Sequence, residues 1–401
     1  MDVMTKNKTV PKLRFKKFDN STDINSYTRY SFTDVFHFSS GKNIKQNEAS
    51  PEFKIPCVRY GELYHMYGEV IYNIINKTNL PESELLFSKG DEILLPSAGE
   101  EPIGIGAASA LPFENIAIGR TINILRPKDK EIYSQFYASY YINEKLKKEI
   151  ARLAKGVSIS NVYNSDLKKL KIILPNLEEQ KKVASFISAV DEKIQQLAKK
   201  KELLEEYKKG VMQKIFSQEL RFKDSNGNNY PDWEEIKLGE VLDYEQPGKY
   251  IVKSTKYDNS YKTPVLTAGK TFLLGYTDEI ENIFLKTPVI IFDDFTMANK
   301  FVDFPFKVKS SAMKILKPSD ENVNMVFIYK IMQMIIYPKG DEHKRFWISE
   351  YSKIKISYPS NKEQKKIANF LSSLDSKIDL VSTQIENTKA FKKGLLQQMF
   401  V

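Results

Sequence analysis

Basic residues stand directly beside aromatic residues at several points in segments that are rich in turn-forming residues. An arginine fork can read the edge of a guanine, a lysine can hold a phosphate, and an aromatic face can pack on a sugar or a base. This combination favours contact with nucleic acid. The candidate DNA-contacting residues are Arg59, Tyr60, Lys249, Tyr250, Lys256, Tyr257, Lys262, Lys344 and Arg345.

Acidic residues occur in two patterns that resemble catalytic motifs. Pro231-Asp232 followed by Glu235-Ile-Lys237 mimics a nuclease motif, but the carboxylates stand only three residues apart (235 − 232) in an irregular segment, which indicates coincidence. Asp293-Asp294 could bind a metal ion, yet no cluster of further ligands accompanies it, and a turn at a strand end accounts for the pair. A metal-dependent nuclease that uses Asp293 or Asp294 stays open as an alternative, which metal-dependent cleavage by the isolated chain would support.

The histidine, cysteine and glycine residues give no sign of a metal or cofactor site. His37, His65 and His343 are scattered, and the single Cys57 leaves no zinc-ligand spacing. The Gly104-Ile-Gly106 segment lacks the third glycine and the strand–turn–helix context of a nucleotide site. A Walker A loop and the Asp-Pro-Pro-Tyr and Asn-Pro-Pro-Tyr tetrapeptides of methyltransferases are also absent from the sequence. We therefore expect a non-catalytic chain with no metal or cofactor of its own.

The balance of charges indicates a polyanionic partner. The 401 residues include 61 Lys and Arg against 51 Asp and Glu, a formal charge of +10, and such a surplus favours nucleic acid or a membrane surface. No apolar run approaches the roughly 20 residues of a membrane span, and the N-terminal residues 1–8 contain no apolar signal core. The lone Cys57 excludes an internal disulfide, as suits a reducing compartment. We expect a cytoplasmic chain of two or three domains without a membrane partner.

A long segment of the chain occurs twice. Residues 175–216 recur at 359–400, at an offset of 184 (359 − 175). The first copy begins Pro175-Asn-Leu-Glu-Glu-Gln-Lys-Lys-Val-Ala184 and the second begins Pro359-Ser-Asn-Lys-Glu-Gln-Lys-Lys-Ile-Ala368. Proline, a polar capping residue and glutamates in the first turn predict the start of a helix in each copy. A period of this length indicates two half-molecules in tandem and is too long for a solenoid.

The segments that precede the two helices repeat more faintly. Leu13-Arg-Phe15 resembles Leu220-Arg-Phe222, and Tyr27 with Phe32-Thr-Asp-Val35 aligns with Trp233 and Leu238-Gly-Glu-Val241 at an offset of 206 (233 − 27). The residues between these flanks differ in number and in nearly every position, which indicates one frame that holds two different inserts. The expected boundaries are 1–174 for the first domain, 175–218 for its helix, 219–357 for the second domain and 358–401 for its helix.

Both inserts show the pattern of mixed α and β structure. Short β-branched and aromatic runs between turn residues predict strands at 69–75, 92–95, 116–118, 121–125, 264–267, 288–292 and 312–316. A helix is expected before the last strand of each insert, at 134–154 and at 324–336. The fold class is therefore α/β (α+β), with two tandem domains that are each followed by a long helix.

Apolar residues follow a 4,3 alternation along both long helices, which is typical of a coiled-coil seam. The seam residues are Val183, Ile187, Val190, Ile194, Leu197, Leu204, Val211, Ile367, Leu371, Leu374, Ile378, Val381, Ile385 and Leu395. Because the two seams share one register, the helices can pair within the chain, and antiparallel pairing would bring Val183 near Met399. Helices of about 40 residues would be roughly 60 Å long, so they could act as a ruler between two domains.

Lys208 and Lys392 interrupt the seam at the same place in both copies. A polar residue in a seam costs stability but can fix register and partner, and this interpretation makes the lysines a pairing device. Alternatively, their long stems extend to solvent at the edge of the seam. The sequence leaves both interpretations open.

The helix motif and its repeat resemble a known family. The run Leu-Pro-x-Leu-Glu-Glu-Gln-Lys-Lys from Leu174, completed by Lys-Lys-Gly-x-x-Gln-Lys-x-Phe up to Phe216, is similar to the specificity subunit of type I restriction–modification systems. Trp233 with the run Leu238–Val241 and Thr263-Pro-Val-Leu-Thr-Ala-Gly269 adds to the resemblance, which covers essentially the whole chain. It implies two target recognition domains, each reading one half of a split DNA site, joined by conserved antiparallel helices. At the front, Tyr27 and Phe32-Thr33 depart from the pattern, which affects where the first domain begins.

The resemblance also implies partners and the location of cofactors. The partners would be double-stranded DNA, two modification subunits that methylate adenine, and restriction subunits that act as motor and nuclease in phage defence. S-adenosylmethionine, ATP and Mg²⁺ would belong to those partner subunits. An alternative from a different class is a cytoplasmic coiled-coil scaffold whose basic charge only keeps it in solution, and it predicts no salt-dependent binding to duplex DNA.

Overall fold

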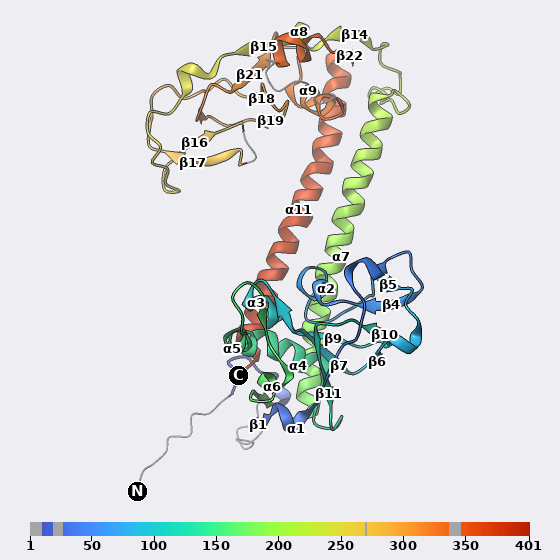
Figure 1. The fold of residues 1–401 in the computed structure, drawn as a ribbon. Helices are drawn as coiled ribbons and strands as arrows, with labels where there is room; N and C mark the ends of the chain where they lie inside the picture. Colours follow the sequence, from blue (N-terminus) through green and yellow to red (C-terminus); the bar gives the residue numbers. More distant parts are fainter. Residues whose placement is uncertain (1–9, 19–26, 269–270, 337–345) are drawn as a thin grey trace. The chain divides into compact units, whose positions relative to one another are not determined.

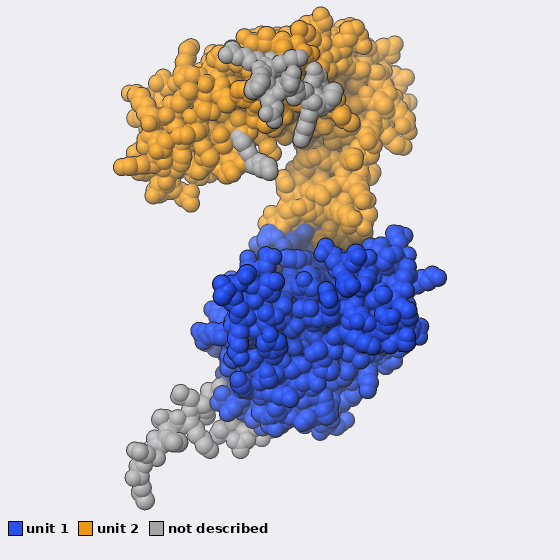
Figure 2. Space-filling view, viewed as in Figure 1, with its two compact units in different colours: residues 1–197, 384–401 blue, residues 198–383 orange. Residues whose placement is uncertain are grey.

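The computed structural model describes residues 10–18, 27–268, 271–336 and 346–401, which divide into two compact units (Figures 1 and 2). Unit 1 comprises residues 1–197 and 384–401, and unit 2 comprises residues 198–383. Each unit therefore contains one insert together with a part of each long helix.

The described residues of unit 1 form four small sheets. Its strands are β1 (Thr28–Ser31), β2 (Phe36–Ser40), β3 (Ala49–Ser50), β4 (Ile55–Val58), β5 (Lys77–Thr78), β6 (Phe87–Lys89), β7 (Glu92–Pro96), β8 (Ala98–Gly99), β9 (Ser109–Leu111), β10 (Glu114–Ile118), β11 (Ile122–Pro127), β12 (Ser160–Asn161) and β13 (Lys171–Leu174). The strand orders are β3-β5-β4-β10-β6, β2-β11-β7-β9, β1-β13 and β12-β8. Its helical segments are η1 (Lys16–Phe18), α1 (Phe32–Val35), η2 (Gln46–Glu48), α2 (Tyr60–His65), η3 (Glu82–Glu84), α3 (Pro102–Ile105), α4 (Gln135–Tyr141), the π-helical η4 (Ile142–Leu146), α5 (Lys147–Leu153) and α6 (Asn164–Leu167).

Unit 2 repeats the main sheets in reduced form. Its strands are β14 (Glu234–Lys237), β15 (Leu242–Glu245), β16 (Thr263–Leu266), β17 (Leu273–Thr277), β18 (Val289–Asp293), β19 (Asn299–Val302), β20 (Lys307–Val308), β21 (Met313–Pro318) and β22 (Lys355–Tyr358). The strand orders are β15-β21-β18-β19, β17-β16-β20 and β14-β22. The insert's helical segments are α8 (Leu238–Val241), η5 (Pro247–Tyr250), α9 (Met325–Met332), α10 (Phe346–Ser349) and η6 (Tyr351–Lys353).

The two inserts share a topology despite their different sequences. The order β2-β11-β7-β9 of unit 1 corresponds to β15-β21-β18-β19 of unit 2, and the entry pair β1-β13 corresponds to β14-β22. In each unit one strand pair is parallel, β4 with β10 and β16 with β20. The helix expected before the last strand is present in both, as α4 to α5 and as α9. The predicted class, α/β (α+β) in two tandem halves, is confirmed.

One predicted strand is wrong. Residues 69–75 form no strand, and only Val70 makes an isolated bridge, to Ala110. Successive apolar side chains of this segment enter different cores, because Val70 packs with the cluster beside the long helices and Ile71 packs with a second cluster. The apolar run therefore reflects burial on two sides of an irregular segment.

Each long helix follows the last strand of an insert. Helix α7 spans Leu177–Phe216 and α11 spans Asn361–Met399. The Asn176 side chain accepts a hydrogen bond from the Glu179 N–H (2.9 Å) and so caps α7, as predicted. The corresponding Ser360 does not cap α11 in this way, because its buried hydroxyl has no hydrogen-bond partner within the described chain.

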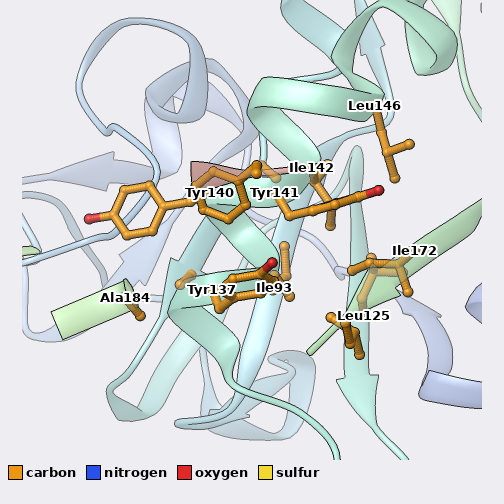
Figure 3. Close-up of a cluster of buried hydrophobic side chains, with 14 of the residues drawn as sticks. Ile93, Leu125, Tyr137, Tyr140, Tyr141, Ile142, Leu146, Ile172 and Ala184 are labelled. Carbon is orange, nitrogen blue, oxygen red and sulfur yellow. The ribbon is translucent and has the colours of Figure 1, made fainter. Parts of the chain in front are cut away.

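The helices pack antiparallel, and this is visible within each unit separately. In unit 1 the start of α7, through Val183 and Val190, lies in one apolar cluster with Leu395 and Met399 from the end of α11. In unit 2 the end of α7 lies in one cluster with the start of α11, including Ile215 and Leu371 respectively. Helix α4 contributes its tyrosines to the unit 1 cluster, and Figure 3 shows Tyr137 together with Ala184 of α7 and Ile93 of β7.

The structure places the seam residues at two levels of burial. The buried ones are Val183, Ile187, Val190, Leu197, Val211, Ile367, Leu371, Leu374, Val381, Ile385 and Leu395. Ile194, Leu204 and Ile378 are half-buried. The half-buried positions lie toward the middle of each helix.

The first turn of each long helix is tied to the segment that precedes its insert. In unit 1 Arg14 donates two hydrogen bonds (both 2.7 Å) to the buried Glu179 carboxylate, which also accepts the Tyr27 hydroxyl (3.0 Å). In unit 2 Arg221 and the Trp233 indole N–H donate to the buried Glu363 carboxylate at 2.8 and 2.9 Å. Glu179 and Glu363 are related by the 184-residue offset, so the faint repeat at the front of each half has a structural cause.

A glutamine one residue later repeats a second tie. The Gln180 side chain accepts from the backbone N–H at the start of α4 (2.9 Å), and the Gln364 side chain accepts from Asn324 at the start of α9 (3.1 Å). Each amide also donates to the carbonyl of the proline that precedes its long helix, Pro175 or Pro359. One backbone hydrogen bond near the end of each long helix repeats as well. The Leu220 N–H donates to the Lys214 carbonyl of α7, and the Leu13 N–H donates to the Gln398 carbonyl of α11 (2.9 Å each).

The lysines that interrupt the seam make ion pairs between the helices. In unit 1 Lys392 pairs with Asp191 (2.7 Å) and with Glu69 (2.8 Å). In unit 2 Asp375 pairs with Lys208 and with Lys330. The structure therefore favours the pairing interpretation of the two lysines over simple extension into solvent.

Candidate nucleic-acid interface

The Arg59–Tyr60 pair lies at a sheet edge that is suited to binding a ligand. Strands β4 and β10 run parallel, with Val58 beside Ile118, so their carboxyl ends meet at one edge. Ligands of α/β proteins favour such edges. Arg59 follows β4 directly and Arg120 stands two residues after β10 (120 − 118). Both arginines line a cleft of about 410 Å³ at this edge.

The guanidinium of Arg59 is held by a buried carboxylate. The Arg59 Nε donates to Glu62 Oε1 at 2.9 Å, and the Glu62 side chain is 1% exposed. Glu62 also accepts from the Arg59 backbone N–H (3.2 Å) and from the Asn76 side chain (2.9 Å). With several donors around it, the carboxylate has a fixed orientation, and it fixes the plane of the arginine in turn.

Tyr60 is exposed beside a half-buried neighbour. Its ring is 42% exposed and contacts the Tyr64 ring edge-on, with 6.4 Å between the centroids. The Tyr64 hydroxyl donates to the Ala98 carbonyl (2.5 Å), and burial raises the pKa of that hydroxyl. Gly104 leaves room for this ring, because a Cβ there would lie 2.6 Å from it. This glycine therefore serves the packing of Tyr64, and Tyr60 is the more exposed of the two residues.

Three further basic residues of the cleft were not predicted from the sequence. Lys45, His65 and Arg120 line it together with Arg59 and Tyr60. A signal for Arg120 was available, since Gly119-Arg120 follows the predicted strand at 116–118. What could not be read from the sequence is that this strand runs parallel to the one before Arg59.

In unit 2 the predicted basic residues and their aromatic neighbours have different environments. Lys249, Lys256 and Lys262 are exposed, whereas Tyr250 and Tyr257 are half-buried. The Tyr257 side chain lies against Gly275, where an added Cβ would come within 2.8 Å of the Tyr257 Cβ and 3.4 Å of the ring's Cγ. Lys344 and Arg345 lie outside the described residues.

Tyr250 is part of the framework of unit 2. Its hydroxyl donates to Glu245 (2.7 Å) and its ring contacts Phe284 edge-on at 5.1 Å. Burial and the Glu245 hydrogen bond raise the pKa of Tyr250 to about 12. The same hydrogen bond lowers the pKa of the Glu245 carboxyl. Lys249 is thus the member of this pair that is presented to solvent.

The acidic candidates are occupied in structural roles. Asp293, at the end of β18, accepts from the Phe295 N–H (2.9 Å) and from the Thr296 hydroxyl (2.7 Å), which closes the turn that the sequence predicts. Asp294 accepts from the Trp347 N–H (2.9 Å) and pairs with Lys314 (3.5 Å). The two carboxylates of the nuclease-like pattern have separate partners. Asp232 pairs with Arg221, and Glu235 pairs with Lys355.

Other features bear on which chemistries the chain can support. Within the described residues, His, Cys, Asp and Glu form no group of three that could hold a metal ion. His343 lies outside them. Cys57 is buried, and burial raises the pKa of its thiol to about 12, so it stays protonated at neutral pH. Among the described helices, none combines the length and apolar character that crossing a membrane requires.

Comparisons with known proteins agree with this architecture. The type I restriction modification DNA specificity domain matches the chain twice, at residues 25–206 and 230–389. The EcoR124I/EcoR124II specificity subunit of Escherichia coli is 52% identical over 136 residues, which are 32% of this chain and 33% of that protein, so this match spans about a third of its length. The MjaVIII specificity subunit of Methanocaldococcus jannaschii is 29% identical over 79% of this chain and 80% of its own length.

A solved structure shows the same fold. The crystal structure of a type I restriction–modification S subunit from M. genitalium superimposes with a TM-score of 0.66, at 20% sequence identity, over 98% of this chain and 99% of that one. Specificity subunits supply recognition of DNA sequence and are not the catalytic subunits of their enzymes. With both halves of the chain matched by the family's domain, this protein belongs to the type I restriction–modification DNA specificity subunits.

Proposed function

We propose that this chain recognises a bipartite target in double-stranded DNA, with one half of the target read by each insert. The observation that carries this proposal is the repetition of the frame around unlike inserts. The sheet order, the hydrogen bonds from an arginine to Glu179 or Glu363, and the long helix occur in both halves of the chain. The inserts, in contrast, differ in nearly every residue. A frame that repeats while its inserts vary suits two readers of different sequences.

The proposed readers are residues 1–174 and 219–357, and the proposed spacers are 175–218 and 358–401. Arg59 and Tyr60 would contact DNA in the first reader, and Lys249, Lys256 and Lys262 in the second. The formal charge of +10 supports binding to a polyanion. The proposed role also implies the cytoplasm, where the DNA lies.

We further propose that the long helices dock two modification subunits, and that restriction subunits join that complex. Tyr207 on α7 and Phe391 on α11 support this proposal, because they are related by the 184-residue offset and are 54% and 55% exposed. Exposed aromatic residues are enriched in protein–protein interfaces. S-adenosylmethionine, ATP and Mg²⁺ would be bound by the partner subunits and not by this chain.

The decisive test is methylome sequencing of cells that carry this chain with its modification subunits. Wild-type cells are expected to show methylated adenines in one bipartite motif. A chimera that replaces residues 27–170 with another subunit's insert should change one half of the motif and leave the other half intact. If both halves changed together, or if no motif were methylated, the two-reader proposal would fail.

A second test addresses the helices as spacers. Each added residue contributes about 1.5 Å of rise and about 100° of rotation. Matched insertions in both helices that add whole turns should lengthen the gap between half-sites and leave the half-sites unchanged. Insertions of a single residue should reduce methylation more strongly, because they also rotate one reader relative to the other. Loss of both half-sites with whole-turn insertions would contradict the spacer role.

Binding of the assembled methyltransferase to duplex DNA should also weaken steeply with salt, because Lys and Arg displace counterions from phosphates. The slope of log affinity against log salt measures this. A flat plot would support the scaffold alternative.

A further inference from the structure

Arg59 lies in the cleft that follows β4 and β10, and only part of its guanidinium is hydrogen-bonded. Its Nε is bonded to Glu62, and within the described residues its two terminal nitrogens have no hydrogen-bond partner. The side chain is 19% exposed and lines the cleft. The free edge of the guanidinium is therefore available to a ligand in the cleft, in a plane that the protein has already set.

A buried carboxylate behind an arginine changes what that arginine is suited to. It offsets much of the positive charge, so Arg59 attracts a distant phosphate less strongly than an unpaired cation would. It also fixes the fork geometrically, which matters for a ligand that must be bonded at two points in one plane. Guanine presents two such acceptors, O6 and N7, in the major groove of DNA, and paired hydrogen bonds from arginine are its most common specific contact.

The other cations of the cleft have the opposite character. Arg120 is exposed, and its guanidinium has no hydrogen-bond partner among the described residues. Lys45 is 60% exposed and lies 3.8 Å from Glu48, a weak surface pair. Solvent-exposed cations are suited to phosphates, which require charge more than orientation. The cleft thus combines one fixed fork with cations at its rim.

The backbone brings the two strand ends close enough for this arrangement. The Gly119 N–H donates to the Val58 carbonyl (2.8 Å), which joins the residue after β10 to the last residue of β4. A Cβ on Gly119 would lie 3.1 Å from that carbonyl oxygen and 3.5 Å from the Arg59 Cγ. Glycine at this position therefore allows the backbone to approach the Val58 carbonyl closely, and the Arg59 stem lies at ordinary contact distance beside it.

Unit 2 has the same backbone arrangement with different side chains. The Lys309 N–H donates to the Leu266 carbonyl (2.8 Å), as Gly119 does to Val58. By this register Thr267 stands at the position of Arg59, and Ser310 at the position of Arg120. The fork is a feature of the first insert alone at this site, so its base preference should appear in one half-site only.

We propose that Arg59, held by Glu62, reads the O6 and N7 edge of one guanine in the half-site of the first insert, while Arg120 and Lys45 hold neighbouring phosphates. This proposal rests on the proposed function, because it assigns a base to one of the two readers. Tyr60 borders the fork and packs on the sugar or base next to that guanine.

The test uses the methyltransferase assembled from this chain and its modification subunits, with the target motif taken from wild-type methylome sequencing. Arg59→Ala and Arg59→Lys should each reduce discrimination at one G·C pair of one half-site by about 5- to 150-fold. A target duplex with 7-deazaguanine at that position lacks N7. It should bind wild type more weakly than the normal duplex, whereas Arg59→Ala should bind both equally.

Arg120→Gln is the matched comparison within the cleft. It should weaken binding to all duplexes alike and reduce the salt slope by about one, as loss of a phosphate contact does. Arg152→Gln, an exposed arginine on α5, is the control outside the cleft and should change neither quantity. Retention of the second half-site by each variant shows that the complex is assembled.

Two results would overturn the proposal. One is an unchanged motif with unchanged discrimination in Arg59→Ala. The other is a uniform loss of affinity with a shallower salt slope in Arg59→Ala, which would make Arg59 a phosphate contact. Failure of the proposed function is a separate outcome, because it shows as absence of any methylated motif in the wild type.

Discussion

In each unit a charged cluster joins the insert to the pair of long helices, and we call this cluster the joint. The two joints have net charges of opposite sign. In unit 1 one lysine, Lys392, faces two carboxylates, Asp191 and Glu69. In unit 2 one carboxylate, Asp375, faces two lysines, Lys208 and Lys330. The Lys–Asp pair between the helices is common to both, since each member recurs at the 184-residue offset.

The groups that the inserts add to this Lys–Asp pair differ between the two units. The Asp191 carboxylate accepts from the Tyr140 hydroxyl (2.6 Å), and Asp375 accepts from Lys330. Tyr140 and Lys330 each stand six residues after the N-cap residue of their helix, Ser134 and Asn324 (140 − 134 and 330 − 324). Glu69 then adds a second acid in unit 1. The helices thus offer one fixed acceptor, and each insert supplies its own donor, which explains how one frame can carry unlike inserts.

If the long helices pack alike in both units, core residues related by the 184-residue offset should contribute equally to the free energy of unfolding. Ile187 and Leu371 are related by the offset, and both are fully buried. Replacing either by Ala should cost about 2–5 kcal/mol in the free energy of unfolding. Urea denaturation gives the size of each loss, and hydrogen exchange locates it in the unit concerned.

Leu380→Ala is the control for this pair, because Leu380 is 60% exposed and its truncation should change stability by less than about 0.5 kcal/mol. Losses that differ by more than a factor of two between Ile187→Ala and Leu371→Ala would break the comparison. The helices would then be equivalent in sequence but not in energy.

The charged joints should respond unequally to the same substitution. Asp375→Asn leaves Lys208 and Lys330 facing each other without a carboxylate, and it should cost about 1.5–3 kcal/mol. Asp191→Asn should cost less than half as much, because Lys392 keeps Glu69 and the Tyr140 hydroxyl can still donate to the amide oxygen. Urea denaturation of both variants measures the difference.

Lys330→Met in the Asp375→Asn background sharpens this prediction. It removes the like-charge repulsion and should recover part of the loss. The prediction fails if the two Asp→Asn variants lose the same free energy of unfolding, or if Lys330→Met recovers none of the loss. Either result would mean that the charged groups of the inserts, Glu69 and Lys330, are not energetically coupled to the Lys–Asp pairs.

The sequence predicted what is encoded locally. The 4,3 pattern and the capping signals located α7 and α11, because helix periodicity and caps depend on residues a few positions apart. It left the role of Lys208 open, because Asp375 is 167 residues away, and Glu69 is 323 residues from Lys392. No local pattern reports such pairings.

The candidate site shows the same division. Arg59 and Tyr60 were found because adjacency is visible in the sequence, whereas Arg120, 61 residues further on (120 − 59), joins them only through the parallel pairing of β4 and β10. Tyr250 and Tyr257 have the same adjacency to lysines as Tyr60 has to Arg59, yet their rings are packed into unit 2. Exposure of an aromatic ring depends on tertiary packing, which composition does not report.

The smallest expected difference between the joints is in their dependence on pH. Burial raises the pKa of Asp375, but the hydrogen bonds from Lys208 and Lys330 outweigh it, and the net pKa lies below the usual value. Burial lowers the pKa of Lys392, but Glu69 and Asp191 outweigh it, and the net pKa is raised. A carboxyl with a lowered pKa in the folded state stabilises the protein above its unfolded-state pKa, and this stabilisation is lost as pH falls through the folded-state pKa. A lysine with a raised pKa stabilises the protein below its unfolded-state pKa, and this stabilisation is lost as pH rises through the folded-state pKa.

The two joints should therefore weaken at opposite ends of the pH range. The free energy of unfolding, measured by urea denaturation from acid to alkaline pH, should fall less steeply below about pH 4 in Asp375→Asn than in wild type. In Lys392→Met it should fall less steeply above about pH 10. Each variant should keep the wild-type slope at the other end, since the joint of the other unit is intact and serves as its control. A change at the same end of the range in both variants would show that the pH dependence of each joint does not follow the sign of its excess charge.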